Sequence, residues 1–149
     1  MVITQRRLKA LGKGALLGIL LFAGFYGNIF AHEAGHFAVA DYFNLGPKTY
    51  LFDNGTGTGF SFFNQNFYTT YANTSQPNPQ TDFDIALAGP LVNAIITICL
   101  AFAYFKIPAQ KKFLRLMVLI VLIPSAISVI SNLLPVAGTD GGIIWSFLK

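Results

Sequence analysis

The chain has 149 residues, of which 54% are hydrophobic and only 11% are charged. Charged residues usually make up about a quarter of a soluble domain, so this composition argues against a soluble globular protein. The formal net charge is +4, but no cluster combines basic with aromatic residues, and we expect no nucleic-acid partner.

Three long windows of the sequence contain no Asp, Glu, Lys or Arg. They cover residues 14–32, 85–105 and 116–139, and each approaches or exceeds the roughly 20 residues that a helix needs to cross a bilayer. Core helices of a soluble protein would instead carry polar stripes on their outer faces. The sequence therefore predicts an all-α, multi-pass membrane protein with a three-transmembrane-helix core. We expect one domain over residues 1–149, with spans at about 14–43, 85–105 and 116–136 and a loop over 44–84.

The first apolar segment also has features of a cleavable signal peptide. Basic residues precede it, and Ala38-Val39-Ala40 resembles a cleavage site with small residues. The apolar stretch is too long for a signal peptide, however, and cleavage would remove both histidines of the chain. We expect a retained first span.

Basic residues mark one end of the predicted bundle. Eight of the ten Lys and Arg residues either precede the first span or separate the second span from the third. Because cytoplasmic segments are enriched in Lys and Arg, this bias predicts a cytoplasmic N-terminus and an outward C-terminus in the cell (inner) membrane. The eight residues are Arg6, Arg7, Lys9, Lys13, Lys106, Lys111, Lys112 and Arg115.

The only glutamate and the only two histidines fall together in an H-E-x-x-H motif, residues 32–36. On a helix, His32 and His36 project from one face and can share a metal ion, while Glu33 can reach a water molecule beside it. A chance match on a helix surface is the alternative. Because the flanking sequence is apolar, however, these three side chains would be energetically costly unless paired or metal-bound.

A catalytic zinc site needs a third protein ligand, and neither glutamate nor histidine remains to supply it. That leaves mainly the five aspartates. Asp140 is the best suited, because it precedes Gly141-Gly142, where the backbone can approach a bound ion closely. The others are Asp41, on the opposite helical face; Asp53, in a turn; and Asp82 and Asp84, at the start of the second span.

The predicted topology provides an independent check on Asp140. The first and third spans both run outward, so the histidine motif and Asp140 come to the same end of the bundle. Asn93 opens the second span from that end as well.

Three segments in this order resemble the site-2 protease family of intramembrane zinc metalloproteases (M50-like). They are HEAGH at 32–36, GPLVN at 89–93 and NLLPVAGTDGG at 132–142. The resemblance implies one Zn²⁺ per chain, bound by His32, His36 and Asp140, with Glu33 as the catalytic base. It also implies that Asn93 and Asn132 orient the substrate or stabilise the oxyanion.

This chain departs from the family pattern at Thr139, where leucine is frequent, and at Ala137 and Gly138, where prolines are frequent. Many members also place the motif toward the cytosol, whereas the basic residues here place it outward.

The expected function is a zinc-dependent intramembrane endopeptidase that cleaves transmembrane or membrane-proximal segments of membrane-protein substrates. The alternative is a proteolytically silent zinc-binding membrane protein that captures or regulates other membrane helices. Glu33 favours the enzyme, because zinc binding alone would not require a base.

The loop between the first two spans has two interpretations. Residues 48–53 and 59–63 are aromatic-rich runs around Asn54-Gly55, a pattern that predicts a β-hairpin. The resemblance then implies that the hairpin holds an unwound substrate as an added strand. The alternative is a packed outer loop whose aromatic side chains lie at the membrane interface.

Overall fold

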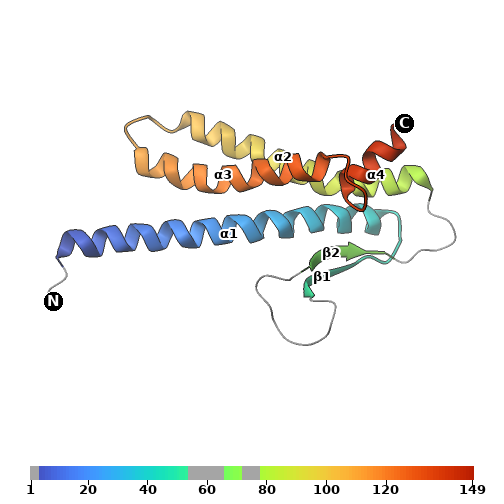
Figure 1. Cartoon of the computed structure of the whole chain (residues 1–149), viewed down its shortest axis with the longest axis horizontal. Helices are drawn as coiled ribbons and strands as arrows, with labels where there is room; N and C mark the ends of the chain where they lie inside the picture. Colours follow the sequence, from blue (N-terminus) through green and yellow to red (C-terminus); the bar gives the residue numbers. More distant parts are fainter. Residues whose placement is uncertain (1–3, 54–65, 72–77) are drawn as a thin grey trace.

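The structure, a computed structural model, describes residues 4–53, 66–71 and 78–149. Three long helices lie side by side, and a short fourth helix and a two-stranded hairpin sit at one end (Figure 1). The predicted three-helix core with a hairpin between its first two helices is therefore confirmed. The elements are α1 (Gln5–Tyr42), β1 (Lys48–Asp53), β2 (Asn66–Thr70), α2 (Pro79–Lys106), α3 (Lys112–Leu133) and α4 (Asp140–Phe147).

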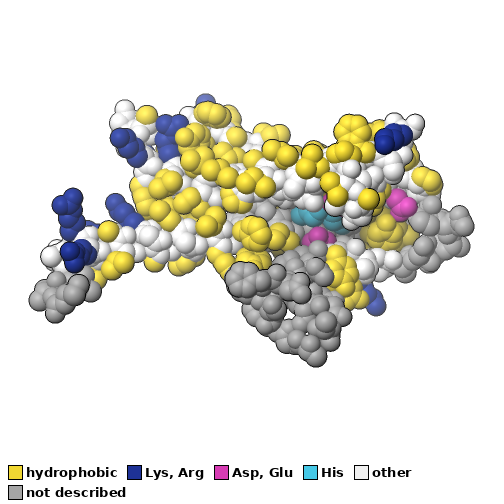
Figure 2. Space-filling view, in the orientation of Figure 1, with side chains coloured by type: hydrophobic (Ala, Val, Ile, Leu, Met, Phe, Trp, Pro, Cys, Tyr) yellow, Lys and Arg dark blue, Asp and Glu magenta, His cyan; other side chains and the backbone are white. Residues whose placement is uncertain are grey.

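The helices α1, α2 and α3 are each long and apolar enough to cross a membrane. Large hydrophobic side chains cover their outer surfaces, and basic side chains gather at the end where α1 begins (Figure 2). The buried polar side chains lie between the helices instead; they are Asn28, His32, Glu33, His36, Asn93 and Ser125. This apolar exterior around a partly polar interior is the arrangement expected of a bundle in lipid.

The helix α2 is the central element, because it packs against α1, α3 and α4. Gly35 on α1 allows the closest approach: a Cβ atom there would lie 2.8 Å from the carbonyl oxygen of Ala88 on α2. Small residues at such contacts are typical of helix pairs in membranes. The contact falls between the two histidines and so brings α2 against the motif.

Hydrogen bonds between side chains connect α2 to α3. The amide of Asn93 donates to the hydroxyl of Ser128 at 2.8 Å, and the hydroxyls of Thr97 and Ser125 lie 2.7 Å apart. Asn93 and Ser125 are fully buried. In an environment without water, such bonds hold two helices in one register.

Several helix boundaries differ from the predicted spans: α2 begins at Pro79 instead of residue 85, and α3 at Lys112 instead of residue 116. The helix α1 begins at Gln5 because residues 5–13 are mostly good helix formers, and its 38 residues give a length of about 57 Å. The helix α3 ends at Leu133, since Leu134 precedes Pro135 and is extended, as proline requires of its neighbour. The helix α4 was not predicted.

The hairpin begins with the predicted strand, Lys48–Asp53, which pairs antiparallel with Asn66–Thr70. The other predicted strand, 59–63, and the turn at Asn54-Gly55 lie outside the described residues. The register places Thr49 opposite Thr69 and Tyr50 opposite Tyr68, and the two tyrosine rings stack at 5.1 Å. Two strands alone are marginally stable, but both also contact α1.

Candidate metal centre

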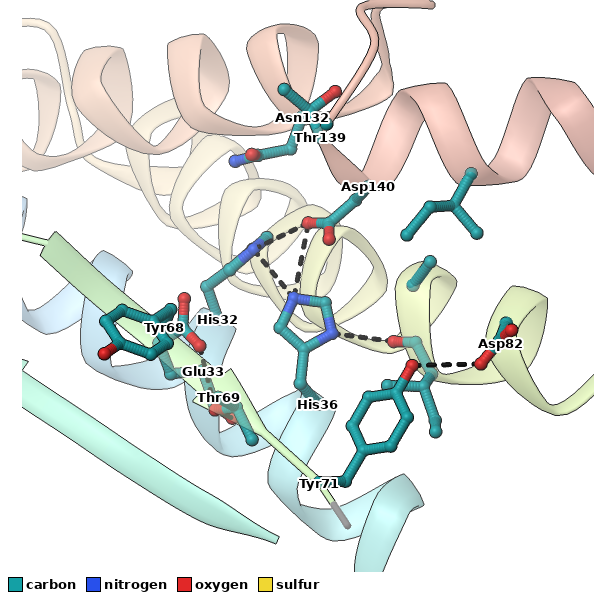
Figure 3. A pocket seen from close by; sticks show the side chains of 14 residues that line it. His32, Glu33, His36, Tyr68, Thr69, Tyr71, Asp82, Asn132, Thr139 and Asp140 are labelled. Atoms are coloured by element: carbon teal, nitrogen blue, oxygen red, sulfur yellow. Dashed lines mark hydrogen bonds and ion pairs between the residues drawn. The ribbon is translucent and has the colours of Figure 1, made fainter. Parts of the chain in front are cut away.

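The two histidines meet near the C-terminal end of α1. Their four-residue spacing on one helical turn brings the Nε2 atoms of His32 and His36 to 3.0 Å from each other. Both side chains are buried, and both point toward the start of α4 (Figure 3). The rings are nearly perpendicular, so their nitrogens converge without the rings overlapping.

The orientation of His36 is set by α2. Its Nδ1 atom lies 2.7 Å from the carbonyl oxygen of Ile85, which can only accept a hydrogen bond, so Nδ1 carries the proton. In a neutral imidazole the Nε2 atom then keeps its lone pair and can bind a metal. A second interaction of this kind is absent at His32, whose buried Nδ1 has no hydrogen-bond partner among the described residues.

Asp140 is the first residue of α4, and its side chain contacts both histidines. Thr139 caps this helix, and its side chain accepts a hydrogen bond from the amide of Gly142 at 3.4 Å. Oδ2 of Asp140 lies 2.9 Å from Nε2 of His32 and 3.3 Å from Nε2 of His36. The helix turns back closely onto the end of α3: a Cβ atom at Gly141 would clash with the carbonyl oxygen of Leu134.

Asp140 is an anion at neutral pH. Burial by itself would raise the pKa of its carboxyl group, but hydrogen bonds from His32 and His36 and their charges, which the rings supply when they are protonated, act in the opposite direction. The net effect lowers this pKa to about 2. The site therefore presents a carboxylate beside two imidazoles.

These three side chains fit a tetrahedral metal ion. Their ligand atoms form a triangle with edges of 2.9, 3.0 and 3.3 Å, close to the roughly 3.3 Å separation expected around zinc with bonds of about 2.0 Å. Three protein ligands are also the usual number at catalytic zinc. Two nitrogen lone pairs and a carboxylate would repel each other at these distances without a shared proton or cation.

Glu33 lies in the same cavity as the three ligand atoms. The cavity has a volume of about 410 Å³ and opens between α1, α2, α4 and the hairpin. One oxygen of the Glu33 carboxylate, Oε2, accepts a 2.8 Å hydrogen bond from the hydroxyl of Thr69 on β2 (Figure 3). The structure thus brings the predicted base and the three predicted ligands together.

The two predicted asparagines have different environments. Asn132 lines the cavity, and its amide donates to the backbone of Ser128 at 2.9 Å. Asn93 is fully buried between α2 and α3 and is not part of the cavity wall. The catalytic roles of both remain predictions, and the geometry is more favourable for Asn132.

Among the described side chains, Asp41, Asp82 and Asp84 are not part of the group of potential ligands. Asp82 lines the cavity and accepts a 3.0 Å hydrogen bond from the hydroxyl of Tyr71. Burial, followed by this hydrogen bond and the charge of Asp82, raises the pKa of Tyr71 to about 12. Tyr71 therefore remains a hydrogen-bond donor at physiological pH and ties the end of the hairpin to α2.

Sequence reasoning missed three contributors to the site: Thr69, Tyr71 and Gly89. A Cβ atom at Gly89 would lie 2.5 Å from Nε2 of His36 and 2.7 Å from Cε1 of His32. The sequence carried a signal for Gly89, which opens the GPLVN segment. Nothing in the sequence distinguished Thr69 from its neighbour Thr70, since only the strand register decides which hydroxyl faces α1.

The fold and the site define a class: a helical membrane protein with two buried histidines, a partly buried aspartate beside them and an adjacent carboxylate, as in hydrolytic metalloenzymes. The model of Peptidase family M50 matches residues 20–112, which is well over half of the chain. The chain belongs to this family, the site-2 protease family, and membership indicates a membrane metalloprotease that is typically zinc-dependent. The match ends before Asp140, so the case for that residue rests on geometry. No curated protein and no solved structure matches the chain.

Proposed function

We propose that this protein is a zinc-dependent intramembrane endopeptidase that cleaves transmembrane or membrane-proximal segments of membrane-protein substrates. One observation carries the proposal: Nε2 of His32, Nε2 of His36 and Oδ2 of Asp140 converge within 3.3 Å of one another, and Glu33 faces the same cavity. Membership of Peptidase family M50 supports it.

His32, His36 and Asp140 would hold one Zn²⁺ per chain. When bound, zinc supplies Lewis-acid chemistry, polarising a carbonyl group and lowering the pKa of water. The hydrogen bond from His36 to the carbonyl of Ile85 keeps Nε2 turned toward the ion. The carboxylate of Asp140 contributes the negative charge that balances a divalent cation in apolar surroundings.

Glu33 serves as the general base and then as the general acid. Its Oε2 atom is engaged by Thr69, so Oε1 is the oxygen that takes the proton from the attacking water. The same oxygen then returns the proton to the leaving nitrogen of the cleaved peptide. Asn132, at the cavity wall, can turn one N–H group toward the developing oxyanion.

The substrate is a polypeptide held in an extended form. A peptide bond within a helix is shielded by its own hydrogen bonds, so the substrate must unwind before its carbonyl carbon can be attacked. The large hydrophobic side chains on the outer surface of the bundle keep the enzyme in the lipid where such substrates reside.

We place the N-terminus of α1 in the cytoplasm and the metal centre toward the outer face of the cell membrane. Basic residues lie in the first turns of α1 and around the connection between α2 and α3. His32 and His36 lie near the other end of α1, and Asp140 begins α4 after the far end of α3 (Figure 1). The positive-inside bias supports this orientation.

The test uses the purified protein in liposomes, with a transmembrane reporter peptide and zinc analysis. The wild type should bind one zinc ion per chain and cleave the reporter. Glu33→Gln should keep the zinc and lose at least about 100-fold in kcat, the lower range for a general base. Zinc retained without cleavage of any panel substrate would favour the silent zinc-binding protein. Absence of zinc would overturn both.

A further inference from the structure

Thr69 connects the hairpin directly to the carboxylate of Glu33. Its Oγ1 atom lies 2.8 Å from Oε2 of Glu33 and 3.2 Å from the backbone carbonyl oxygen of the same residue. Figure 3 shows Thr69 on β2 facing Glu33 on α1. The two residues are 36 positions apart in the sequence, so the tertiary fold alone creates this contact.

The direction of these hydrogen bonds follows from counting protons. A threonine hydroxyl has one proton to donate and two lone pairs that accept. A carboxylate only accepts, and its contact is the shorter of the two, so the proton of Thr69 goes to Oε2. The hydroxyl of Thr49 lies 3.0 Å from that of Thr69, and Thr49 must therefore be the donor in this pair. The result is a chain of donated hydrogen bonds from Thr49 to Thr69 to Glu33.

The register of the hairpin fixes the positions of the Thr49 and Thr69 hydroxyls relative to each other. Thr49 and Thr69 are direct cross-strand partners, so their side chains leave the same face of the sheet. Both strands contact α1, and Thr69 is partly buried there. Thr70 is the next residue of β2, and its exposed side chain lies on the other face.

We propose that Thr69 is a positioning residue, which fixes the Glu33 carboxylate for proton transfer, and that Thr49 orients Thr69. The inference rests on the proposed role of Glu33 as the base. A glutamate side chain has several rotatable bonds, and Thr69 supplies its one side-chain hydrogen bond from the described residues. Thr69 engages Oε2, Glu33 lines the cavity, and Oε1 accepts no bond from Thr69. A displacement of about 1 Å at such a group reduces rates by about 100-fold.

A spectroscopic experiment tests the contact without depending on proteolysis. Glu33 is the only glutamate, so ¹³C-glutamate introduced by cell-free synthesis labels one carboxylate in the protein. Isotope-difference infrared spectra should show its antisymmetric stretch shifted in Thr69→Val and close to wild type in Thr69→Ser, which keeps the hydroxyl. Thr70→Val removes the same atom from the opposite face and should leave the band unchanged. An identical band in all variants would overturn the proposal.

A kinetic experiment tests the consequence for catalysis. Thr69→Val should lower kcat by about 10- to 100-fold, with KM changed less than about threefold and zinc content unchanged. Thr69→Ser should restore most of kcat, Thr49→Val should cause a smaller loss, and Thr70→Val should match the wild type.

The outcomes separate this inference from the proposed function. Full activity in Thr69→Val, alongside an inactive Glu33→Gln, would overturn the inference and leave the proposed function intact. The same would follow if Thr69→Ser were as impaired as Thr69→Val, or if the loss lay in KM. If Thr69→Val does not fold, Thr49→Val and Thr69→Ser decide the matter by the same infrared band. A wild type without cleavage overturns the proposed function, and a shifted band then leaves the positioning contact established.

Discussion

Gly89 lies directly against the imidazole of His36, so close that even a methyl group at this position would lie 2.5 Å from Nε2. The same methyl group would lie 2.7 Å from Cε1 of His32. Because Gly89 has no side chain, the imidazole rings of His32 and His36 can pack directly against the backbone of α2.

We expect Gly89→Ala to destroy the metal centre while the helices still form. Alanine is the better helix former by about 1 kcal/mol, so a loss of zinc would come from displaced histidines and not from a weaker helix. The matched control is Gly27→Ala on α1, where an added Cβ meets nothing within 4 Å. Zinc content and reporter cleavage in both variants measure the effect. Normal zinc binding by Gly89→Ala would contradict the packing described.

Asp140→Ala should remove both zinc and activity. The carboxylate of Asp140 is the one anionic group among the three proposed ligands. Losing a residue that only supports a ligand weakens metal binding by up to about 100-fold, so the loss of a direct ligand should weaken zinc binding by more than that. Asp140→Asn keeps the shape without the charge and should also lose most of the zinc. Metal competition titrations give the affinities. Retention of tight zinc binding in Asp140→Ala would require a different third ligand.

Asn132 and Asn93 should respond differently to alanine. Asn132 lines the cavity, and its loss should lower kcat, on the order of 100-fold if it donates to the oxyanion, with zinc unchanged. Asn93 on α2 donates a hydrogen bond to Ser128 on α3. Its replacement by alanine should lower the free energy of unfolding by about 1 kcal/mol, a typical value for such bonds in membranes. Kinetics and thermal unfolding in detergent distinguish the two effects. Equal catalytic losses at unchanged stability would place Asn93 in the reaction instead.

Tyr71 should ionise at higher pH than an ordinary tyrosine. Its pKa of about 12 exceeds the usual value near 10, first because of burial and then because of Asp82. The folded state therefore favours the neutral phenol: its contribution to stability is complete below about pH 10 and is lost as the pH rises through 12. The tyrosinate absorbance is measured against pH for the wild type and for Tyr71→Phe, and the difference between the two curves gives the ionisation of Tyr71. Asp82→Asn should shift this difference toward pH 10, and an unshifted curve would exclude Asp82 as a cause.

Cysteine labelling should show that the metal centre faces outward. In a Cys99→Ser background, Ser146→Cys on α4 should react with an impermeant maleimide added outside intact cells. Lys111→Cys, between α2 and α3, should react only after permeabilisation. Both parent residues are exposed. The reverse pattern would invert the orientation and show that the basic residues do not decide it here.

The sequence predicted that His32, His36 and Asp140 come together, and the structure places them side by side; their role as zinc ligands remains a prediction. This grouping could be predicted because it depends on local helical periodicity and on the scarcity of other candidate residues. The spacing of His32 and His36 is a property of any helix, and the lack of a second glutamate or a third histidine narrowed the third ligand to the aspartates. The charge-free windows revealed the three helices for a similar reason, since a membrane span imposes its length on the composition.

The parts that escaped prediction depend on contacts between distant segments. The helix α4 was hidden because Gly141 and Gly142 follow its capping Thr139, and glycines usually argue against a helix start. Glycine is required at both positions, because a Cβ atom at Gly141 would clash with the carbonyl oxygen of Leu134, and one at Gly142 with the carbonyl oxygen of Val136. The role of Thr69 depends on a strand register that residues 48–53 alone do not determine.

Asp140, the proposed third ligand, can join α1 only after α2 and α3 have been made. His32 and His36 lie in the first span, whereas Asp140 follows α3 and the turn back into α4. During synthesis from the N-terminus, His36 is made 104 positions, and His32 108 positions, before the carboxylate that completes their triangle. A site built in this order cannot reach its final geometry until α4 has docked, so the proposed activity would have to wait until all three spanning helices are in place.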